Sequence, residues 1–213
     1  MTAPVEPSPS YGRYLWTPVG LMLLALATMW AIEIVDTVAL DDRLQRNGLH
    51  PRERDGIDGI LWAPFLHADF GHVASNSVPF LALGGLVAVR GMRYWAWITV
   101  AVVVVGGGLT WLLGGAGNHV GASGVVFGYF GAILGAAVFE RRIRALAAAL
   151  LALGFYSSLL AGIVPQDAIS WEGHLFGLVA GVLASKVLAE PRITPEERPD
   201  NPEPWEIDEP WLQ

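Results

Sequence analysis

Residues 121–139 read GASGVVFGYFGAILGAAVF, an apolar run without a charged residue. A helix that crosses the hydrocarbon core of a bilayer needs about 20 such residues. Four glycines recur in this run at spacings of three and four, and therefore line one side of a helix: Gly124, Gly128, Gly131 and Gly135. Such small-residue stripes let two helix backbones approach closely in lipid. The run predicts a membrane-spanning helix over residues 123–139 that packs tightly against another helix.

Five further apolar runs of similar length lie along the chain, at residues 14–38, 72–89, 95–113, 143–164 and 171–188. The 213-residue chain is 53% hydrophobic and only 15% charged, whereas soluble domains carry about 25% charged residues. We therefore expect an all-α membrane protein, a bundle of six transmembrane helices that forms one domain over residues 14–189. The first two runs are separated by a loop of about 30 residues, a length that usually indicates a function.

The two ends of the chain differ in composition from the apolar runs. Residues 1–13 are rich in proline and serine, and residues 190–213 combine proline with acids, so both ends are predicted to be disordered. Eight of the 20 acidic residues lie in residues 190–209, which places much of the negative charge in this tail. The sequence has no basic patch interleaved with aromatic residues, so nucleic-acid binding is not expected. The lack of cysteine excludes disulfides and thiolate nucleophiles.

Arginine and lysine are distributed unevenly between the two sides of the predicted bundle. Cytoplasmic loops and ends of membrane proteins are enriched in these residues. One side would carry Arg13, Arg90, Arg93, Arg141, Arg142, Arg144, Lys186, Arg192 and Arg198. The other side would carry four arginines in the long first loop, where five acids balance them. We therefore expect a multi-pass protein of the cell (inner) membrane with both termini in the cytoplasm, so that the second, fourth and sixth spans begin at the outer face.

A serine and a histidine lie at the starts of the fourth and sixth predicted spans, in the segments GASG and GHLFG. Because both spans begin at the same face, Ser123 and His174 should lie at one depth. A nearby base activates a serine, and histidine suits this role near neutral pH. Gly177 and Gly181 follow His174 on its own helix face, which would let the two helices approach closely. A lone serine among glycines is more often a packing residue, whereas an ionisable histidine inside a span by default marks function.

The start of the second predicted span offers two hydrogen-bond donors at the same depth. His72 and Asn76 are four residues apart and therefore share one helix face, where they could hold an oxyanion. The rival interpretation is a metal site made from His67, Asp69 and His72. No further strong ligand follows at a fixed spacing, and a metal would leave the serine without a purpose, so we expect no metal and no cofactor. His119, in the short loop before the fourth span, is interpreted as a solvated loop residue.

Three segments, in this order on the second, fourth and sixth spans, resemble the rhomboid intramembrane serine proteases: His72-x-x-x-Asn76, Gly121-x-Ser123-Gly124 and Gly173-His174-x-x-Gly177-x-x-x-Gly181. The resemblance covers about residues 60–185. It implies a six-helix bundle of rhomboid type, with a water-accessible pocket open to the outer side and a long first loop that lies partly in the membrane. It also implies a Ser-His dyad without an aspartate, in which Ser123 is the nucleophile and His174 is the base.

The resemblance further implies roles for the residues around the dyad. His72, Asn76 and the backbone amide of Ser123 would form an oxyanion hole, and Gly121 would let a substrate strand pass close. Many rhomboids carry a tyrosine four residues after the nucleophile, stacked on the base, where this chain has Phe127. The substitution keeps the ring for stacking and loses the hydroxyl group.

The sequence supports one main hypothesis and two alternatives for function. The main hypothesis is that the Ser-His dyad cleaves transmembrane segments of other membrane proteins within the lipid bilayer. The first alternative is a catalytically inactive rhomboid-like protein that binds and sorts transmembrane segments. Inactive relatives commonly lack the serine or the histidine, and this chain keeps both. The second alternative, a small transporter, predicts an internal repeat, and the two halves of this sequence show no convincing one.

Overall fold

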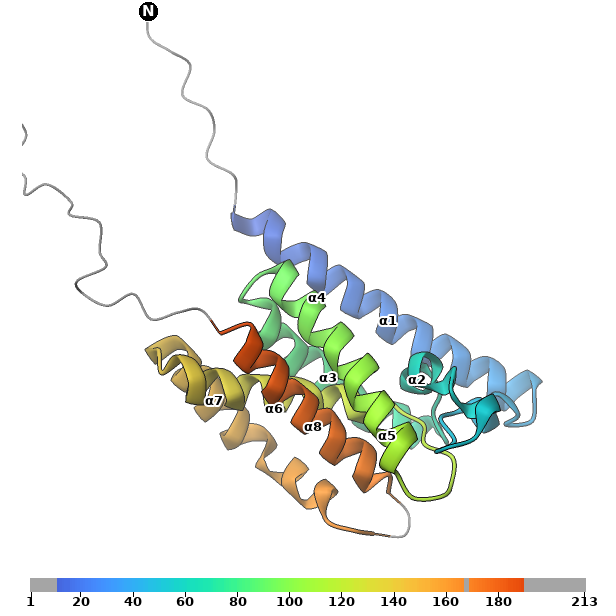
Figure 1. The fold of residues 1–213 in the computed structure, drawn as a ribbon. Helices are drawn as coiled ribbons and strands as arrows, with labels where there is room; N and C mark the ends of the chain where they lie inside the picture. The colour runs from blue at the N-terminus through green and yellow to red at the C-terminus, as the bar shows by residue number, and fades with distance from the viewer. Residues whose placement is uncertain (1–10, 167–168, 190–213) are drawn as a thin grey trace, which may run out of the picture.

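The structure is a computed structural model, and it describes residues 11–166 and 169–189. These residues form helices and their connections (Figure 1), with one isolated antiparallel β-bridge between Leu49 and His119. The elements are α1 (Tyr11–Ala39), η1 (Leu44–Asn47), η2 (Arg54–Gly56), α2 (Gly59–Trp62), η3 (Ala63–Phe65), α3 (Phe70–Ala88), α4 (Met92–Ala101), η4 (Val102–Gly106), α5 (Gly107–Leu113), α6 (Ser123–Glu140), α7 (Ile143–Tyr156), η5 (Ser157–Ile163) and α8 (Trp171–Val187). Of the η segments, η4 is π-helical and the others are 3₁₀-helical.

Five helical segments in the described residues are long and apolar enough to cross a bilayer: Thr17–Ala39, Phe70–Ala88, Met92–Leu113, Ser123–Glu140 and Ile143–Ile163. The predicted all-α membrane architecture is therefore confirmed, and the first five predicted spans coincide with these segments. The sixth predicted span coincides with α8, which has 17 residues. Such a helix is about 26 Å long, a little less than the hydrocarbon thickness of about 30 Å.

The ends of the chain were predicted to be disordered over residues 1–13 and 190–213. Residues 1–10 and 190–213 lie outside the described part of the chain. The helix α1 begins at Tyr11, so the last three residues of the predicted N-terminal segment belong to the first helix. The first and last turns of the described chain, at the start of α1 and the end of α8, lie at the same end of the bundle (Figure 1).

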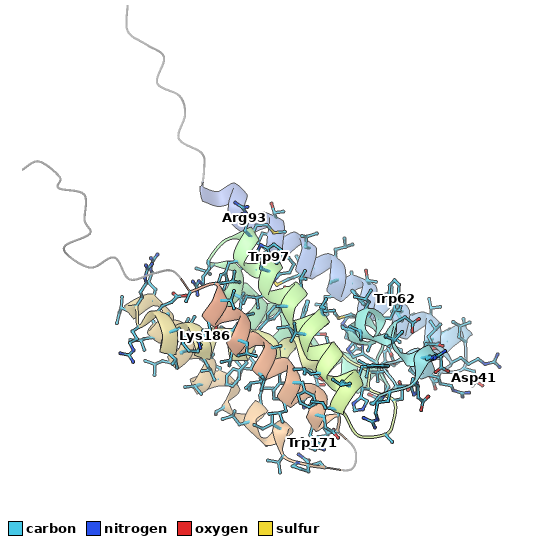
Figure 2. All side chains as sticks on the ribbon, in the orientation of Figure 1. Asp41, Trp62, Arg93, Trp97, Trp171 and Lys186 are labelled. Atoms are coloured by element: carbon cyan, nitrogen blue, oxygen red, sulfur yellow. The ribbon has the colours of Figure 1, made fainter. Side chains whose placement is uncertain are left out.

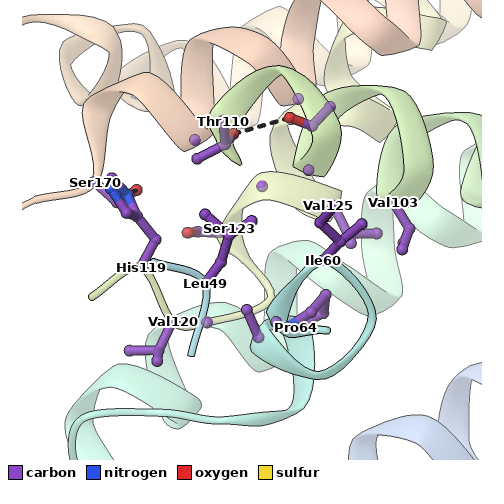
Figure 3. A pocket seen from close by; sticks show the side chains of 18 of the residues that line it. Leu49, Ile60, Pro64, Val103, Thr110, His119, Val120, Ser123, Val125 and Ser170 are labelled. Atoms are coloured by element: carbon purple, nitrogen blue, oxygen red, sulfur yellow. Dashed lines mark hydrogen bonds between the residues drawn. The ribbon is translucent and has the colours of Figure 1, made fainter. Parts of the chain in front are cut away.

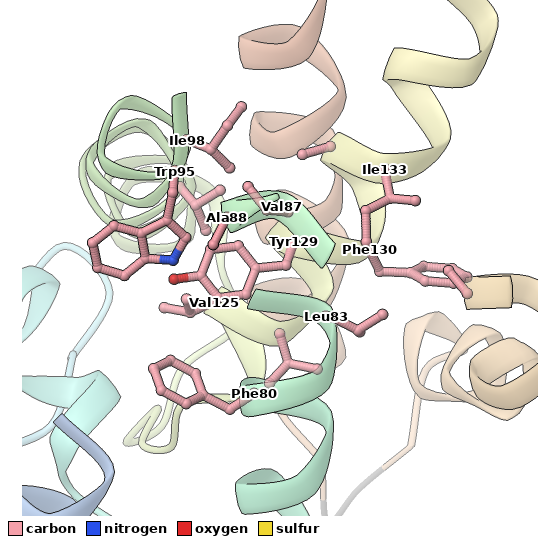
Figure 4. Close-up of a cluster of buried hydrophobic side chains, with 14 of the residues drawn as sticks. Phe80, Leu83, Val87, Ala88, Trp95, Ile98, Val125, Tyr129, Phe130 and Ile133 are labelled. Carbon is pink, nitrogen blue, oxygen red and sulfur yellow. The ribbon is translucent and has the colours of Figure 1, made fainter. Parts of the chain in front are cut away.

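The helix α6 forms the centre of the bundle, because 72% of its residues are buried. Its apolar side chains pack with those of α3 and α4 in a core that includes Phe80, Leu83 and Ile98 (Figure 4). Tyr129 is fully buried in this core, and its hydroxyl group forms a hydrogen bond of 2.9 Å with the hydroxyl group of Thr99. In lipid, a buried hydroxyl group without a partner would be costly, so this bond fixes α6 against α4.

The helices α6 and α8 touch through their backbones, as their glycine stripes predicted. A Cβ atom at Gly177 would overlap the carbonyl oxygen of Gly124, and one at Gly181 would overlap the carbonyl oxygen of Gly128. Further along α6, a Cβ atom at Gly131 would overlap the carbonyl oxygen of Leu178. Only glycine permits so close an approach of two helices. These contacts set the separation of the helices that carry Ser123 and His174.

The long first loop, between α1 and α3, supports the chain segment that leads into α6. Leu49 and His119 exchange backbone hydrogen bonds of 2.9 Å, and the amide of Gly121 donates to the carbonyl oxygen of Ala63 at 2.9 Å. The Arg52 guanidinium donates to the carbonyl oxygen of Gly114 at 2.7 Å. The first loop therefore holds the backbone just before Ser123 from one side.

Charged side chains gather at the two ends of the bundle, as Figure 2 shows for Arg93 and Lys186 at one end and Asp41 at the other. At the first of these ends, Arg90 forms an ion pair of 2.5 Å with the buried carboxylate of Glu140. The helices between the two ends expose apolar side chains, for example Leu24, Leu150 and Phe155. This distribution is that of a bundle that crosses a lipid bilayer.

Candidate active site

Ser123 and His174 meet across the interface between α6 and α8. Ser123 is the first residue of α6, and His174 lies in the first turn of α8. The Nε2 atom of His174 lies 2.8 Å from the Oγ atom of Ser123. This is hydrogen-bonding distance, and it is the arrangement that a histidine needs to take a proton from a serine.

A backbone carbonyl orients the His174 ring. The Nδ1 atom of His174 lies 2.9 Å from the carbonyl oxygen of Gly162, in η5. Because a carbonyl oxygen only accepts hydrogen bonds, Nδ1 of the neutral ring must carry the proton and donate it. The Nε2 atom then has a lone pair that faces the hydroxyl group of Ser123. Gly162 therefore takes the orienting role that a carboxylate has in Ser-His-Asp triads.

Phe127 covers one face of the histidine ring. It lies one turn after Ser123 on α6, and its ring stacks on that of His174 with centroids 4.2 Å apart and planes 6° apart. Phe127 is buried, with 2% of its surface exposed. The stacking leaves the His174 ring little freedom to rotate away from Ser123.

His72 and Asn76 lie on α3 beside the same cavity as Ser123. The amide of Ala68 donates to Nδ1 of His72 at 3.4 Å, which leaves the proton of the neutral ring on Nε2. The Asn76 side-chain amide donates to the carbonyl oxygen of His72 at 3.1 Å. An amide nitrogen has two hydrogens, so this bond uses one of the two donors.

Gly121 has a backbone conformation that favours glycine, with φ at +108°. A Cβ atom at this position would lie 2.7 Å from Nε2 of His72 and 3.5 Å from the amide nitrogen of Asn76. The family resemblance assigned Gly121 to substrate passage. The structure shows in addition that a side chain here would displace the His72 ring.

The dyad opens into a cavity of about 640 Å³. Its walls come from α3, α6, η5 and the start of α8, and include His72, Asn76, Ser123, Phe127, Gly162 and His174. On the other side of Ser123, a smaller cavity of about 60 Å³ is lined by Thr110, His119 and Ser170, among others (Figure 3). Ser123 therefore lies between two spaces, and only the larger one has room for a peptide segment.

Two polar contacts that the sequence analysis missed join the loop before α6 to the start of α8. The Nδ1 atom of His119 lies 2.5 Å from the hydroxyl oxygen of Ser170, and the amide of Gly115 donates to the Glu172 carboxylate at 3.1 Å. The amide of His174 in turn donates to the carbonyl oxygen of Ser170 at 3.2 Å. His119 is a partly exposed loop residue, as predicted, and it also links the loop before α6 to the start of α8.

The three residues of the rival metal hypothesis have structural partners. His67 is 1% exposed, its Nε2 atom accepts a hydrogen bond of 3.4 Å from the amide of Ala122, and its ring meets the edge of the His72 ring. Burial lowers the pKa of His67 to about 4, with a smaller contribution from His72. The Asp69 carboxylate accepts a hydrogen bond of 2.7 Å from the amide of His72, and so caps α3. These residues support the backbone on both sides of the cavity.

Comparisons with known proteins identify the family of this chain. An uncharacterized protein of Mycobacterium tuberculosis and another of Mycobacterium bovis are each 35% identical to this chain, over 84% of the chain and 79% of the relative. An uncharacterized protein of Mycobacterium leprae is 33% identical, over 84% of this chain and 75% of the relative. The model of the Rhomboid domain matches residues 56–191, which include α3, α6, α8 and the Ser123–His174 pair. The chain therefore belongs to the rhomboid family.

Proposed function

We propose that this protein is an intramembrane serine protease that cleaves transmembrane segments of other membrane proteins, with Ser123 as nucleophile and His174 as base. The observation that carries the proposal is the 2.8 Å contact between His174 Nε2 and Ser123 Oγ. The proton on Nδ1 is held by the carbonyl of Gly162, so the lone pair of Nε2 points at the serine. Family membership is consistent with the proposal.

The proposed reaction has two steps. In the first, Ser123 Oγ attacks the peptide carbonyl carbon as Nε2 of His174 takes the serine proton, and His174 then gives this proton to the leaving amine. This step forms an acyl-enzyme and breaks the peptide bond. In the second, water attacks the ester while His174 takes a proton from the water and returns it to Ser123. No metal or cofactor takes part in either step.

Three donors would stabilise the oxyanion that each attack creates. Ser123 is the first residue of α6, and the first amides of a helix have no partner within the helix. The Nε2 hydrogen of His72 and the second amide hydrogen of Asn76 border the same cavity. Donors placed in advance of the reaction are the largest source of rate enhancement in acyl transfer.

The proposed topology has six spans, with α8 as the sixth. The helix α8 is one or two turns shorter than several of the other spans. Its glycines nevertheless allow its backbone to pack directly against that of the buried helix α6. With six spans, both termini lie on one side of the bilayer. The arginines at that end support a cytoplasmic location for both termini, with the catalytic cavity facing the outer side of the cell membrane.

A fluorophosphonate probe tests the proposal directly, because it reacts only with an activated serine. We expect the purified protein in detergent to be labelled, and we expect Ser123→Ala to lose the label. Ser158→Ala is the matched control, since Ser158 is an exposed serine that lines the same cavity. A folded protein that is neither labelled nor able to cleave a transmembrane substrate would favour the inactive, segment-binding alternative.

A further inference from the structure

A second cavity lies at the arginine-rich end of the bundle, far from the dyad along α6. It has a volume of about 250 Å³ and is bounded by α3, α6 and α7 and by the start of α4. Its inner wall is apolar and consists of small and branched side chains: Leu86, Val87, Ala132, Ile133, Ala136 and Ala148. Its outer rim is polar and includes Arg90, Tyr94, Glu140, Arg142 and Arg144. The cavity thus has one charged end and one apolar end.

The charge at the rim is positive. Glu140 is 5% exposed and pairs with Arg90, whose guanidinium also stacks over the Tyr94 ring at 3.8 Å and donates to its hydroxyl group at 2.9 Å. That arrangement balances one arginine with one carboxylate. Arg142 and Arg144 lie at the start of α7, so the rim carries three arginines and one carboxylate, and the helix dipole of α7 also favours an anion there.

The cavity is shaped for an elongated ligand that comes from the lipid. Ala132 and Glu140 are eight residues apart on α6, so the apolar wall runs about 12 Å inward from the charged rim. The rim residue Val89 is 69% exposed, and Ile143, which follows Arg142 in the chain, is 79% exposed. Apolar side chains so exposed at the end of a span face lipid.

We propose that this cavity binds one anionic phospholipid, with its phosphate at Arg144 beside the N-terminus of α7 and part of an acyl chain along the alanine-lined wall. Basic pockets between transmembrane helices on the cytoplasmic side bind anionic headgroups through the same chemistry. The site is separate from the dyad, and it would tie the ends of α3, α6 and α7 together through a bound lipid. It does not depend on whether the protein is a protease.

The charge of the site can be tested by titrating the protein in neutral detergent with phosphatidylglycerol and counting bound lipids by native mass spectrometry. We expect one retained phosphatidylglycerol, and weaker retention of phosphatidylcholine with the same chains. Arg144→Gln should weaken binding about fivefold, the contribution of one basic residue at an anionic headgroup. The matched control is Arg93→Gln at the same end of the bundle, since Arg93 is exposed and lies outside this cavity. Equal effects of the two substitutions would overturn the proposal.

The apolar part of the site is tested by filling it. Ala148→Phe should abolish retention of phosphatidylglycerol, because Ala148 lines the cavity, whereas Ala147→Phe on the exposed side of α7 should leave it unchanged. If Ala148→Phe does not fold, Ala145→Leu narrows the same cavity. Millimolar inorganic phosphate should not displace the lipid. Displacement by phosphate, or unchanged retention in the folded cavity-filling variant, would show a simple anion site and overturn the lipid assignment.

Discussion

The two sides of the cavity at Ser123 and His174 are built in different ways. On one side, α6 has 72% of its residues buried, and its backbone touches that of α8 through glycines. On the other side, only 11% of an 18-residue stretch within Ile143–Ile163, which covers α7 and η5, is buried. Both reacting side chains are on the tightly packed side. The exposed segment reaches the dyad chiefly through the carbonyl of Gly162.

The difference in packing indicates that the two sides of the cavity have different roles. The backbone contacts between α6 and α8 leave no room for sliding, so they fix the distance between Ser123 and His174. The segment of α7 and η5 has few buried contacts to hold it, and regions with few buried contacts open most easily. Under the proposed function, the tightly packed side would set the geometry of the reaction, and the exposed side, which borders the 640 Å³ cavity, would be where a substrate helix enters.

The largest effect is expected from removing the reacting groups on the tightly packed side. Ser123→Ala and His174→Ala should each lower cleavage of a model transmembrane substrate by more than about 10³-fold, and the double variant should be little worse, because the two residues act as one unit. The measurement is cleavage in proteoliposomes. Additive losses would show that the pair does not act together, and substantial cleavage by Ser123→Ala would disprove the assignment of the nucleophile.

A glycine substitution on each side tests the packing difference itself. Gly181→Ala should lower the free energy of unfolding by about 3 kcal/mol, because the new methyl group would overlap the carbonyl oxygen of Gly128. Gly154→Ala in α7 should be neutral, because no heavy atom outside its own helix lies within 4 Å of the new Cβ position. The melting temperatures of both variants in detergent provide the measurement. Similar melting temperatures for the two variants would show that the two sides of the cavity do not differ in packing.

Asn76, on α3, should show the opposite pattern to Gly181, with a loss of rate and little loss of stability. Removing one oxyanion donor costs roughly 10²–10³ in turnover. Because His72 and the Ser123 amide remain, and because water could replace part of the donor, we expect Asn76→Ala to lower kcat by about tenfold to a hundredfold. KM should stay within a few fold, since the oxyanion exists only in the transition state. A lower melting temperature with normal kcat would instead show a packing role.

The smallest effect is expected at Gly162, where the exposed segment forms a hydrogen bond with the dyad. Gly162→Ala would place a methyl group 3.1 Å from Nδ1 of His174 and 2.9 Å from the Phe127 ring, and so tilt the base. We expect kcat to fall about tenfold, because small misplacements of catalytic groups are costly. The melting temperature should not change, and Gly154→Ala serves as the control for the same segment. A normal kcat would show that the methyl group fits without displacing the His174 ring.

Much of the architecture could be predicted from local patterns in the sequence. The apolar runs marked the five confirmed candidate spans, and the glycine spacings on α6 and α8 indicated which faces meet. Errors were small and lie at helix ends. The second span begins at Phe70 because Asp69 caps it, a signal that was present in the sequence and was overlooked. The π-helical segment η4 within the third span has no simple sequence signal.

The amino-acid sequence by itself determined which residues are available to the site and which helices carry them, because hydropathy and spacing are properties of neighbouring residues. Only the tertiary structure decided how these residues are supported. Three hydrogen bonds join distant parts of the chain around the site. They link Gly162 with His174, His119 with Ser170, and Gly121 with Ala63. Backbone groups occur at every residue, so no pattern of side chains could show which of them would face the dyad.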